Sequence, residues 1–164
     1  MKNGIYEKIV DHITENQEKF YRLAYSYVQN KEDALDVVQN AICQALDHYE
    51  TVKNENAVRT WFYRILVNES LLFLRQRKRE VLAGDEKPME IPYYERRYDS
   101  SGEEIYEQIS RLEEDVQCIV KLRFFEELTL KEISDVMQMN LNTVKAKLYR
   151  GLKQLKQNIK EADL

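Results

Sequence analysis

The stretch from Thr129 to Leu155 constrains the fold of this chain more than any other, because it predicts two helices separated by a tight turn. Apolar residues at helical spacing predict a short helix over residues 131–137, and residues 138–140 then interrupt the pattern. A second helix is predicted from residue 141, with one apolar stripe in steps of four, four, three and four residues. Two helices joined in this way, the second apolar on one side only, are typical of a helix-turn-helix. The members of the second stripe are Val144, Leu148, Leu152, Leu155 and Ile159.

The opposite side of the second predicted helix is basic. Residues 141–160 contain six lysine and arginine residues and no aspartate or glutamate. A solvated helix face usually mixes charges of both signs, so this imbalance favours a surface that lies in the major groove of DNA. The alternative is a basic amphipathic hairpin packed in a helical bundle, with lysines that are merely solvated. The polar side carries Thr143, Lys145, Lys147, Arg150, Lys153 and Lys156.

The turns around these two helices carry matching capping signals. Thr129 followed by Glu132 predicts a capping box at the start of the first helix. Asn140 and Asn142 are both suitable caps for the second helix, because a short side-chain oxygen accepts hydrogen bonds from unpaired backbone N–H groups. The positive end of that helix would then face the DNA phosphates.

Charge is strongly segregated along the chain, although the total is only −4. Residues 59–79 and 121–160 each carry a net charge of +5, whereas residues 80–115 carry −8. Because phosphate binding depends on local charge density, two separate basic blocks favour a nucleic-acid ligand in spite of the acidic total.

The sequence offers no motif for catalysis. His12 and His48 lie on separate predicted helices without spaced Cys, Asp or Glu partners, and no Gly-rich phosphate loop occurs. We therefore expect a protein that is not an enzyme, with no catalytic residue, no metal site and no cofactor. Cys43 and Cys118 lie in apolar helical patterns, which predicts small buried side chains in a reducing compartment. No signal peptide or membrane-length apolar run is found, so we expect no membrane insertion and a cytoplasmic location.

Helical periodicity divides the chain into two parts. It predicts helices over residues 5–12, 17–28, 32–49 and 61–79, with a polar loop over residues 50–60. The periodicity fails over residues 81–102, which contain both prolines and mixed charges. It returns at residue 103 and predicts a helix that continues to the helix-turn-helix, with Leu112, Val116, Ile119, Val120 and Phe124 on its apolar side. We therefore expect an all-α fold of two small helical domains, residues 1–80 and 103–164, joined by a flexible acidic linker over residues 81–102.

The predicted helix over residues 61–79 begins with three adjacent aromatic residues, Trp61, Phe62 and Tyr63. Successive helical residues point about 100° apart, so at least one of the three should reach the surface beside Arg64. An exposed aromatic ring among basic side chains can stack on an unpaired nucleobase. Alternatively, Trp61 and Phe62 are core residues and Tyr63 is half exposed. Asn68 lies among apolar residues, so its amide needs a partner, either a backbone group or a DNA base.

The predicted helix over residues 32–49 has a wide apolar stripe and a polar side without any base. We interpret the polar side as a protein interface, because acids in a phosphate-binding protein should point away from DNA; a plain solvated face is the alternative. The stripe contains Ala34, Leu35, Val38, Ala41, Ile42, Ala45 and Leu46, and the polar side contains Asp33, Asp36, Gln39, Asn40 and Gln44.

Three segments in this order resemble the sigma-70 family of bacterial RNA polymerase initiation factors, specifically its extracytoplasmic-function (ECF) group. DALDVVQNAICQAL at 33–46 resembles the core-polymerase-binding segment, often written DAEDLVQETF, with Leu35 and Asn40 in place of two acids. WFYRILVNESLLFLRQRKR at 61–79 resembles the helix that recognises and opens the −10 promoter element. Residues 128–155 resemble the −35-reading domain with the pattern SxGTVKSRLxRA, in which Asn142, Ala146 and Lys147 replace Gly, Ser and Arg.

The resemblance implies a non-catalytic transcription initiation factor, with sigma region 2 at residues 1–80 and sigma region 4, a helix-turn-helix, at residues 103–164. The implied partners are core RNA polymerase (the coiled coil of β′ and the flap of β), promoter DNA with one −10 base flipped out, and an anti-sigma factor. The resemblance assigns Asp33, Asp36, Val37, Gln39 and Asn40 to core polymerase, Trp61, Tyr63, Arg64, Asn68 and Arg75 to the −10 element, and Asn142, Thr143, Lys145, Lys147 and Arg150 to the −35 element.

The acidic linker would be repelled by phosphate, so we expect it to follow the RNA-exit path of the polymerase as a mimic of nucleic acid.

The main alternative to an initiation factor is a helix-turn-helix regulator that binds operator DNA as a dimer and needs a symmetric dimer face. A purely structural adaptor of polymerase would leave the basic face unused.

Overall fold

The computed structural model describes residues 2–84, 105 and 107–162. The chain divides into two compact units, an N-terminal unit (Met1–Asp85) and a C-terminal unit (Glu86–Leu164). Every regular element among the described residues is helical, which confirms the predicted all-α class. The predicted linker over residues 81–102 lies almost wholly outside the described residues, and so does the path expected for it.

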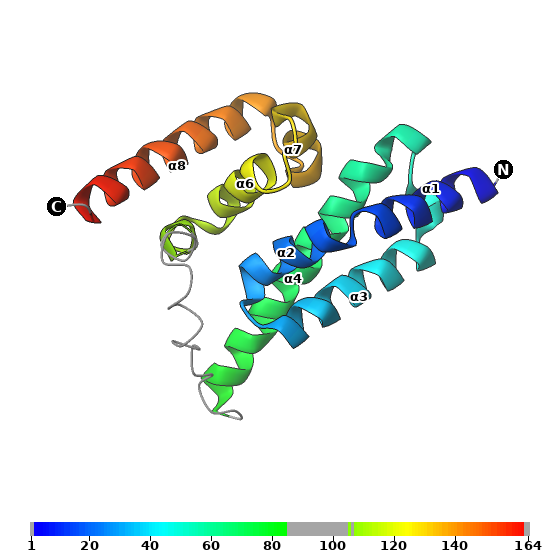
Figure 1. Ribbon diagram of the computed structural model, residues 1–164, viewed down its shortest axis with the longest axis horizontal. Helices are drawn as coiled ribbons and strands as arrows, with labels where there is room; N and C mark the ends of the chain where they lie inside the picture. Colours follow the sequence, from blue (N-terminus) through cyan, green and yellow to red (C-terminus); the bar gives the residue numbers. More distant parts are fainter. Residues whose placement is uncertain (1, 85–104, 106, 163–164) are drawn as a thin grey trace. The chain divides into compact units, whose positions relative to one another are not determined.

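The N-terminal unit is a bundle of four helices, with two 3-10 turns between the third and the fourth (Figure 1). The C-terminal part of the fourth helix extends past the other three (Figure 1). The elements are α1 (Lys2–Glu15), α2 (Gln17–Val28), α3 (Lys31–Asp47), η1 (Tyr49–Thr51), η2 (Glu55–Ala57) and α4 (Val58–Ala83).

Local signals explain the tight connection between α2 and α3. The helix predicted over residues 17–28 matches α2. It ends at Gln29, which adopts a left-handed conformation (φ 53°) and donates its N–H to the Tyr25 carbonyl. Asn30 then caps α3, because its side-chain oxygen accepts from the Asp33 N–H at 3.0 Å. The two helices are therefore fixed as an antiparallel pair by only two connecting residues.

Aromatic residues form the core between α1, α2 and α4. Phe20 lies 4.6 Å from Phe62 and 5.4 Å from Tyr63 between ring centroids, and the His12 ring lies against all three. Tilted and edge-to-face pairs of this kind add about 0.5–1.5 kcal/mol each beyond the area that they bury. Phe62 and Tyr63 thus hold the start of α4 against the bundle.

Two expectations for α3 were wrong. Leu35, predicted in the apolar stripe, is 51% exposed, because the buried side of α3 is narrow and is lined mainly by alanine and valine. Cys43, predicted as buried, is exposed, whereas Cys118 is fully buried as predicted. A narrow stripe suffices for α3 because small side chains let it approach α2 and α4 closely.

The fourth helix is longer than predicted. It begins at Val58 and ends at Ala83, where Gly84 provides a left-handed cap (φ 75°). The loop predicted over residues 50–60 therefore contains the first turn of α4 as well as η1 and η2. The sequence pattern predicted the end of the helix at residue 79 because apolar periodicity stops there. The helix nevertheless continues, since the end of α4 leaves the bundle and needs no apolar stripe.

The C-terminal unit contains helical residues 107–110, then α6 (Glu114–Phe124), α7 (Leu130–Met137) and α8 (Leu141–Ala162). The helix predicted to run from residue 103 to Phe124 is interrupted at residues 111–113. Gln117 explains the interruption, because its side-chain amide donates to the carbonyl groups of Ser110 and Leu112 at 3.0 Å each. Phe124, predicted on the apolar side, is 53% exposed.

The core of the C-terminal unit lies where α6, α7 and α8 meet. Leu112, Ile119, Leu122, Leu128, Ile133 and Val144 are buried there. Gly151 lets α8 approach α6 closely, since a Cβ at this position would lie 2.6 Å from Val116 Cγ1. The separation of α6 and α8 is therefore set by the missing side chain of Gly151.

Candidate functional site

The turn between α7 and α8 has the predicted geometry. Thr129 Oγ1 accepts from the Glu132 N–H at 3.1 Å, and Glu132 Oε1 accepts from the Thr129 N–H at 2.9 Å, which confirms the capping box. Gln138 ends α7 in a left-handed conformation. Asn140 caps α8, since its Oδ1 accepts from the Asn142 N–H at 2.8 Å and its carbonyl from the Val144 N–H at 3.0 Å. Of the two predicted caps, the structure thus selects Asn140.

The outward face of α8 is polar and basic. Asn142, Thr143, Lys145 and Arg150 are exposed, whereas Val144 is fully buried against the rest of the unit. No acidic residue occurs between residues 141 and 160. This face can therefore approach phosphates without repulsion and offers hydrogen-bond donors to base edges.

Lys147 differs from its basic neighbours. It is half-buried and forms an ion pair with Asp115 at the start of α6. The hydrogen bond from Lys147, together with its charge, lowers the pKa of the Asp115 carboxyl below its usual value. Helical periodicity explains the position, because Lys147 lies about 60° around α8 from the buried Val144 and about 60° from the exposed Arg150, at the edge of the outward face. Its side chain is turned to α6, away from the outward face.

Tyr149, which was not predicted from the sequence to contact DNA, lies on the outward face. Its side chain is 63% exposed, one turn after Lys145 and next to Arg150. An exposed aromatic ring between two basic side chains can contact a thymine methyl group or a sugar of the DNA. The signal was present, because Tyr149 lies two turns from Asn142 on the same side of α8.

A second polar face runs along α4. Trp61, Arg64, Asn68 and Arg75 all lie within about 60° of one another around the helix axis. Arg64, Asn68 and Arg75 are exposed, and Trp61 is half-buried. The bundle thus presents one aromatic ring, one amide and two guanidinium groups on a single side.

Tyr63 lies on the other side of α4 and is only 1% exposed. The alternative in which Tyr63 is half exposed and Trp61 is core is therefore wrong. Periodicity separates the two residues, which are two positions apart and so point in nearly opposite directions. We expect Tyr63 to hold α4 in place and not to touch a ligand.

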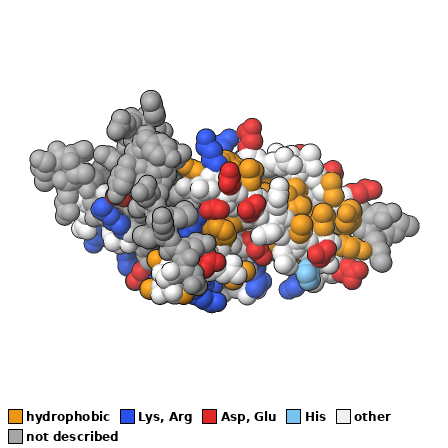
Figure 2. All heavy atoms as spheres, turned by 90° about the horizontal axis from the view of Figure 1, so that it is seen from below, with side chains coloured by type: hydrophobic (Ala, Val, Ile, Leu, Met, Phe, Trp, Pro, Cys, Tyr) orange, Lys and Arg blue, Asp and Glu red, His pale blue; other side chains and the backbone are white. Residues whose placement is uncertain are grey.

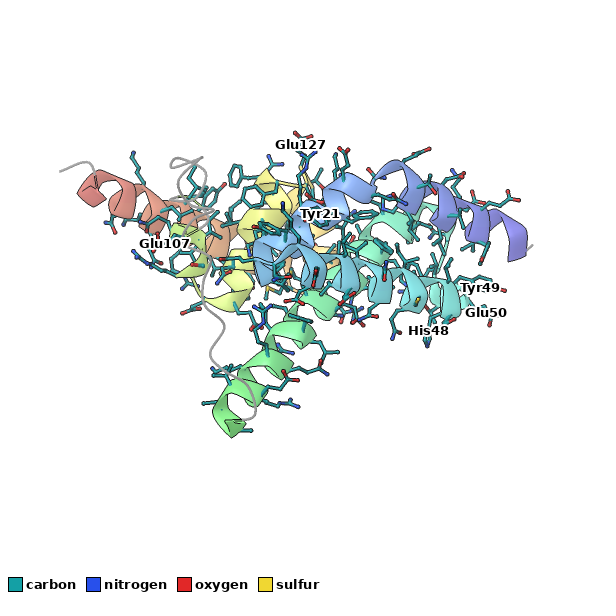
Figure 3. All side chains as sticks on the ribbon, turned by 60° about the horizontal axis from the view of Figure 1, so that its bottom comes forward. Tyr21, His48, Tyr49, Glu50, Glu107 and Glu127 are labelled. Carbon is teal, nitrogen blue, oxygen red and sulfur yellow. The ribbon has the colours of Figure 1, made fainter. Side chains whose placement is uncertain are left out.

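A hollow of about 290 Å³ adjoins this face of α4. The Trp61 Nε1–H donates to Thr51 Oγ1 at 3.1 Å, which ties η1 to α4 at the edge of the hollow. Figure 3 labels His48, Tyr49 and Glu50 at the end of α3, where η1 begins. The hollow is open to solvent, and its size suits one planar ring. Its walls are formed by Gln44, His48, Thr51, Trp61, Ile65, Asn68 and Glu69.

The polar side of α3 is only partly as predicted. Asp36, Gln39 and Asn40 are exposed and share one side of the helix. Asp33 is half-buried and accepts from Arg77 at 2.7 Å, and Val37 is 1% exposed. Asp33 and Val37 thus support α3 from within the bundle.

A groove of about 720 Å³ lies between α2 and α3, next to the acidic side of α3. Leu35, Val38 and Ile42 supply its apolar floor, and Tyr21 and Arg22 stand on the α2 side. Figure 2 shows apolar and acidic side chains next to each other at the surface, and Figure 3 labels Tyr21 on α2. An apolar groove with a charged rim is suited to an amphipathic helix of a partner.

Other kinds of site find little support in the residues that the structure describes. In that part of the chain, no group of three or more His, Cys, Asp or Glu side chains could hold a metal ion. No helix there is long and apolar enough to span a bilayer.

Comparisons with known proteins agree on one family. Residues 12–80 match the family model of sigma-70 region 2, and residues 102–155 match that of sigma-70 region 4. The chain is 39% identical over 156 residues to the RNA polymerase sigma factor SigV of Bacillus subtilis, covering 95% of this chain and 93% of SigV. It is 25% identical to the ECF RNA polymerase sigma-E factor of Haemophilus influenzae, covering 93% and 94% of the two chains.

Two solved structures share the fold. The sigma factor RpoE of Bartonella quintana, solved in complex with the anti-sigma factor NepR, has a TM-score of 0.71 at 20% identity, covering 92% of this chain and 97% of RpoE. CnrH, solved in complex with the cytosolic domain of CnrY, has a TM-score of 0.69 at 16% identity, covering 95% and 89%.

Proposed function

Because the chain belongs to the ECF group of the sigma-70 family and is a transcription initiation factor for bacterial RNA polymerase, we propose how its surfaces divide this work. The exposed side of α3 and the α2–α3 groove bind core polymerase. The outward face of α4 holds the −10 element, and the outward face of α8 reads the −35 element. The charges support this division, since α3 is acidic where α4 and α8 are basic.

The −35 assignment rests on the outward face of α8, which is basic and without any acid. Lys145 and Arg150 are positioned for phosphates and base edges, and Asn142 and Thr143 stand at the capped start of the helix. Tyr149 joins this set as a contact to base or sugar.

The −10 assignment rests on the hollow beside α4. One unpaired base could enter it and stack on Trp61, while the Asn68 amide faces the hydrogen-bonding edge of the base. Stacking of one base on an aromatic side chain contributes about 1–3 kcal/mol, which offsets much of the cost of unstacking it. Arg64 and Arg75 would hold the backbone of the separated strand.

The polymerase assignment rests on Asp36, Gln39 and Asn40 beside the groove. The coiled coil of β′ is the proposed ligand of this surface, and the flap of β that of the C-terminal unit. We further propose that the protein acts in the cytoplasm, does not catalyse a reaction itself, and is controlled by an anti-sigma factor. The domain limits of 1–80 and 103–164 belong to the same proposal.

The test is a pair of charge reversals in the complete chain, Lys145→Glu together with Arg150→Glu. Both side chains are exposed, so the fold should be retained. We expect the variant to form holoenzyme normally and to lose transcription from promoters that need a −35 element. Loss of polymerase binding together with promoter binding would contradict the assigned division. Lys147 is left unchanged in this test because it pairs with Asp115.

A further inference from the structure

Lys147 lies in the recognition helix α8, among residues proposed to bind DNA, but its side chain forms an ion pair within the protein, with Asp115 of α6. Resting on the proposed function, we propose that Lys147 is a positioning residue, which orients the recognition helix α8 by pairing with Asp115 of α6. In this role Lys147 does not contact DNA, although Lys145 before it and Arg150 after it do.

The first argument is the direction of the side chain. Around α8, Lys147 lies at the edge of the outward face, about 60° from the exposed Arg150 and about 60° from the buried Val144. Its side chain is only 22% exposed, whereas Lys145 and Arg150 are exposed. A lysine can extend its ammonium group past a helix, but here the Nζ already donates to Asp115 Oδ2.

The second argument is that Asp115 is itself fixed. Its Oδ1 accepts from the Val116 N–H at 2.8 Å, while its Oδ2 accepts from Lys147. It lies in the first turn of α6, where a carboxylate is favoured by the positive end of the helix. Both carboxylate oxygens are therefore bound, and the acid offers Lys147 a partner of defined position.

The third argument is the geometry of the α6–α8 crossing. Gly151, one turn after Lys147, lies against Val116, the residue that follows Asp115. The apolar contacts of Gly151, Val144 and Leu148 hold α8 against the unit but have little directional preference. The ion pair of Lys147 with Asp115 adds a directional contact one turn before Gly151, which opposes rotation of α8 about its own axis. Because base readout depends on side-chain directions, a fixed rotation of α8 is needed for the outward face to meet the major groove.

The experiment compares Asp115→Asn, Lys147→Met, Lys147→Arg and Lys145→Met in holoenzyme. The probe is a duplex chosen by the wild-type holoenzyme from a pool randomised in the −35 region, with a scrambled duplex as reference. Binding is measured from low to high salt, at a temperature where hydrogen exchange shows α6 and α8 to be protected. Asp115→Asn keeps a side-chain oxygen that accepts from the Val116 N–H, so the structure at the start of α6 should be unchanged.

We expect Asp115→Asn and Lys147→Met to lower the preference for the selected duplex by about threefold or more, with an unchanged slope of log affinity against log salt. Lys147→Arg, which keeps the ion pair, should behave like wild type. Lys145→Met should reduce the salt slope by about one, as expected for the loss of one phosphate contact.

Two outcomes would overturn the inference. If Lys147 contacts DNA, Lys147→Met reduces the salt slope and Asp115→Asn tightens binding, because a nearby acid is removed. If the pair only stabilises the fold, both variants lower protection in hydrogen exchange while the preference is unchanged. Failure of the proposed function looks different, since wild-type holoenzyme would then select no −35 sequence and Lys145→Met would have no effect.

Discussion

Replacement of Gly151 by alanine tests how the recognition helix is held. In most helices this change is favourable by about 1 kcal/mol, because alanine is a better helix former than glycine. Here the new Cβ would lie 2.6 Å from Val116 Cγ1, and also 3.6 Å from Val120 Cγ2. The first separation is far below van der Waals contact, so α6 and α8 must move apart or Val116 must leave its preferred rotamer.

The two effects oppose each other and can be compared. Overpacking of a well-packed core costs about 1–3 kcal/mol, and the gain in helix propensity recovers about 1 kcal/mol. We therefore expect Gly151→Ala to destabilise the C-terminal unit by about 1 kcal/mol, a fall in melting temperature of about 4–8 °C for a unit of this size. Val116→Ala alone should cost about 2–3 kcal/mol through loss of buried methyl groups and the cavity left behind.

The double variant makes the test specific. In Gly151→Ala with Val116→Ala, the new methyl group enters the space that Val116 leaves, so the combined cost should be smaller than the sum by at least about 1 kcal/mol. Hydrogen exchange of peptides from α6 and α8 measures the C-terminal unit. The fluorescence of Trp61, the only tryptophan, reports on the N-terminal unit as an internal control. Additive costs, or stabilisation by Gly151→Ala alone, would refute the view that Gly151 sets the helix separation.

Three further predictions concern other parts of the chain. Burial, with repulsion from Arg59, lowers the pKa of His12 to about 4, so the neutral ring contributes stability that is fully present above the unfolded pKa of 6.5 and is lost as the pH falls towards 4. Urea denaturation followed by Trp61 fluorescence should show that the free energy of unfolding falls by about 2 kcal/mol over this pH range, a figure that is reduced for the partial exposure of the His12 ring. The same pH dependence in His12→Gln would show that His12 is not the cause. Gln138→Gly should stabilise the C-terminal unit by about 0.5–1 kcal/mol in thermal unfolding, because the residue has φ 52°, and a decrease would show that its side chain matters more than its backbone. Leu35→Asp should weaken holoenzyme formation at least about tenfold in a binding titration without loss of stability, whereas Leu82→Asp, at a residue that is also exposed but lies outside the groove, should not; equal behaviour of the two would remove the groove from the interface.

Elements that depend on local signals were predicted well from the sequence. The capping box at Thr129, the break at residues 138–140 and the limits of α2 follow from residues adjacent in the chain, and the structure confirms them. The family and the all-α fold were also predictable, because three motifs occur in a fixed order along the chain.

The errors arose where tertiary packing decides. Leu35 fits an apolar stripe but faces solvent, because alanine and valine alone fill the narrow contact of α3. The ion pairs of Asp33 with Arg77 and of Lys147 with Asp115 also depend on tertiary packing, because each joins residues far apart in the sequence. No local pattern reveals these partners. Tyr63 is different, since helical spacing alone separates it from Trp61 and could have assigned it to the core.

The central claim is that this chain binds core polymerase through the exposed side of α3. The most direct measurement mixes the purified protein with bacterial core RNA polymerase and determines the affinity, with Asp36→Arg as the matched variant. Asp36 is exposed, so its replacement should not disturb the fold. We predict a stable complex that the substitution weakens strongly. Absence of a complex, together with specific binding of duplex DNA by the protein alone as a dimer, would contradict the account and indicate a stand-alone regulator.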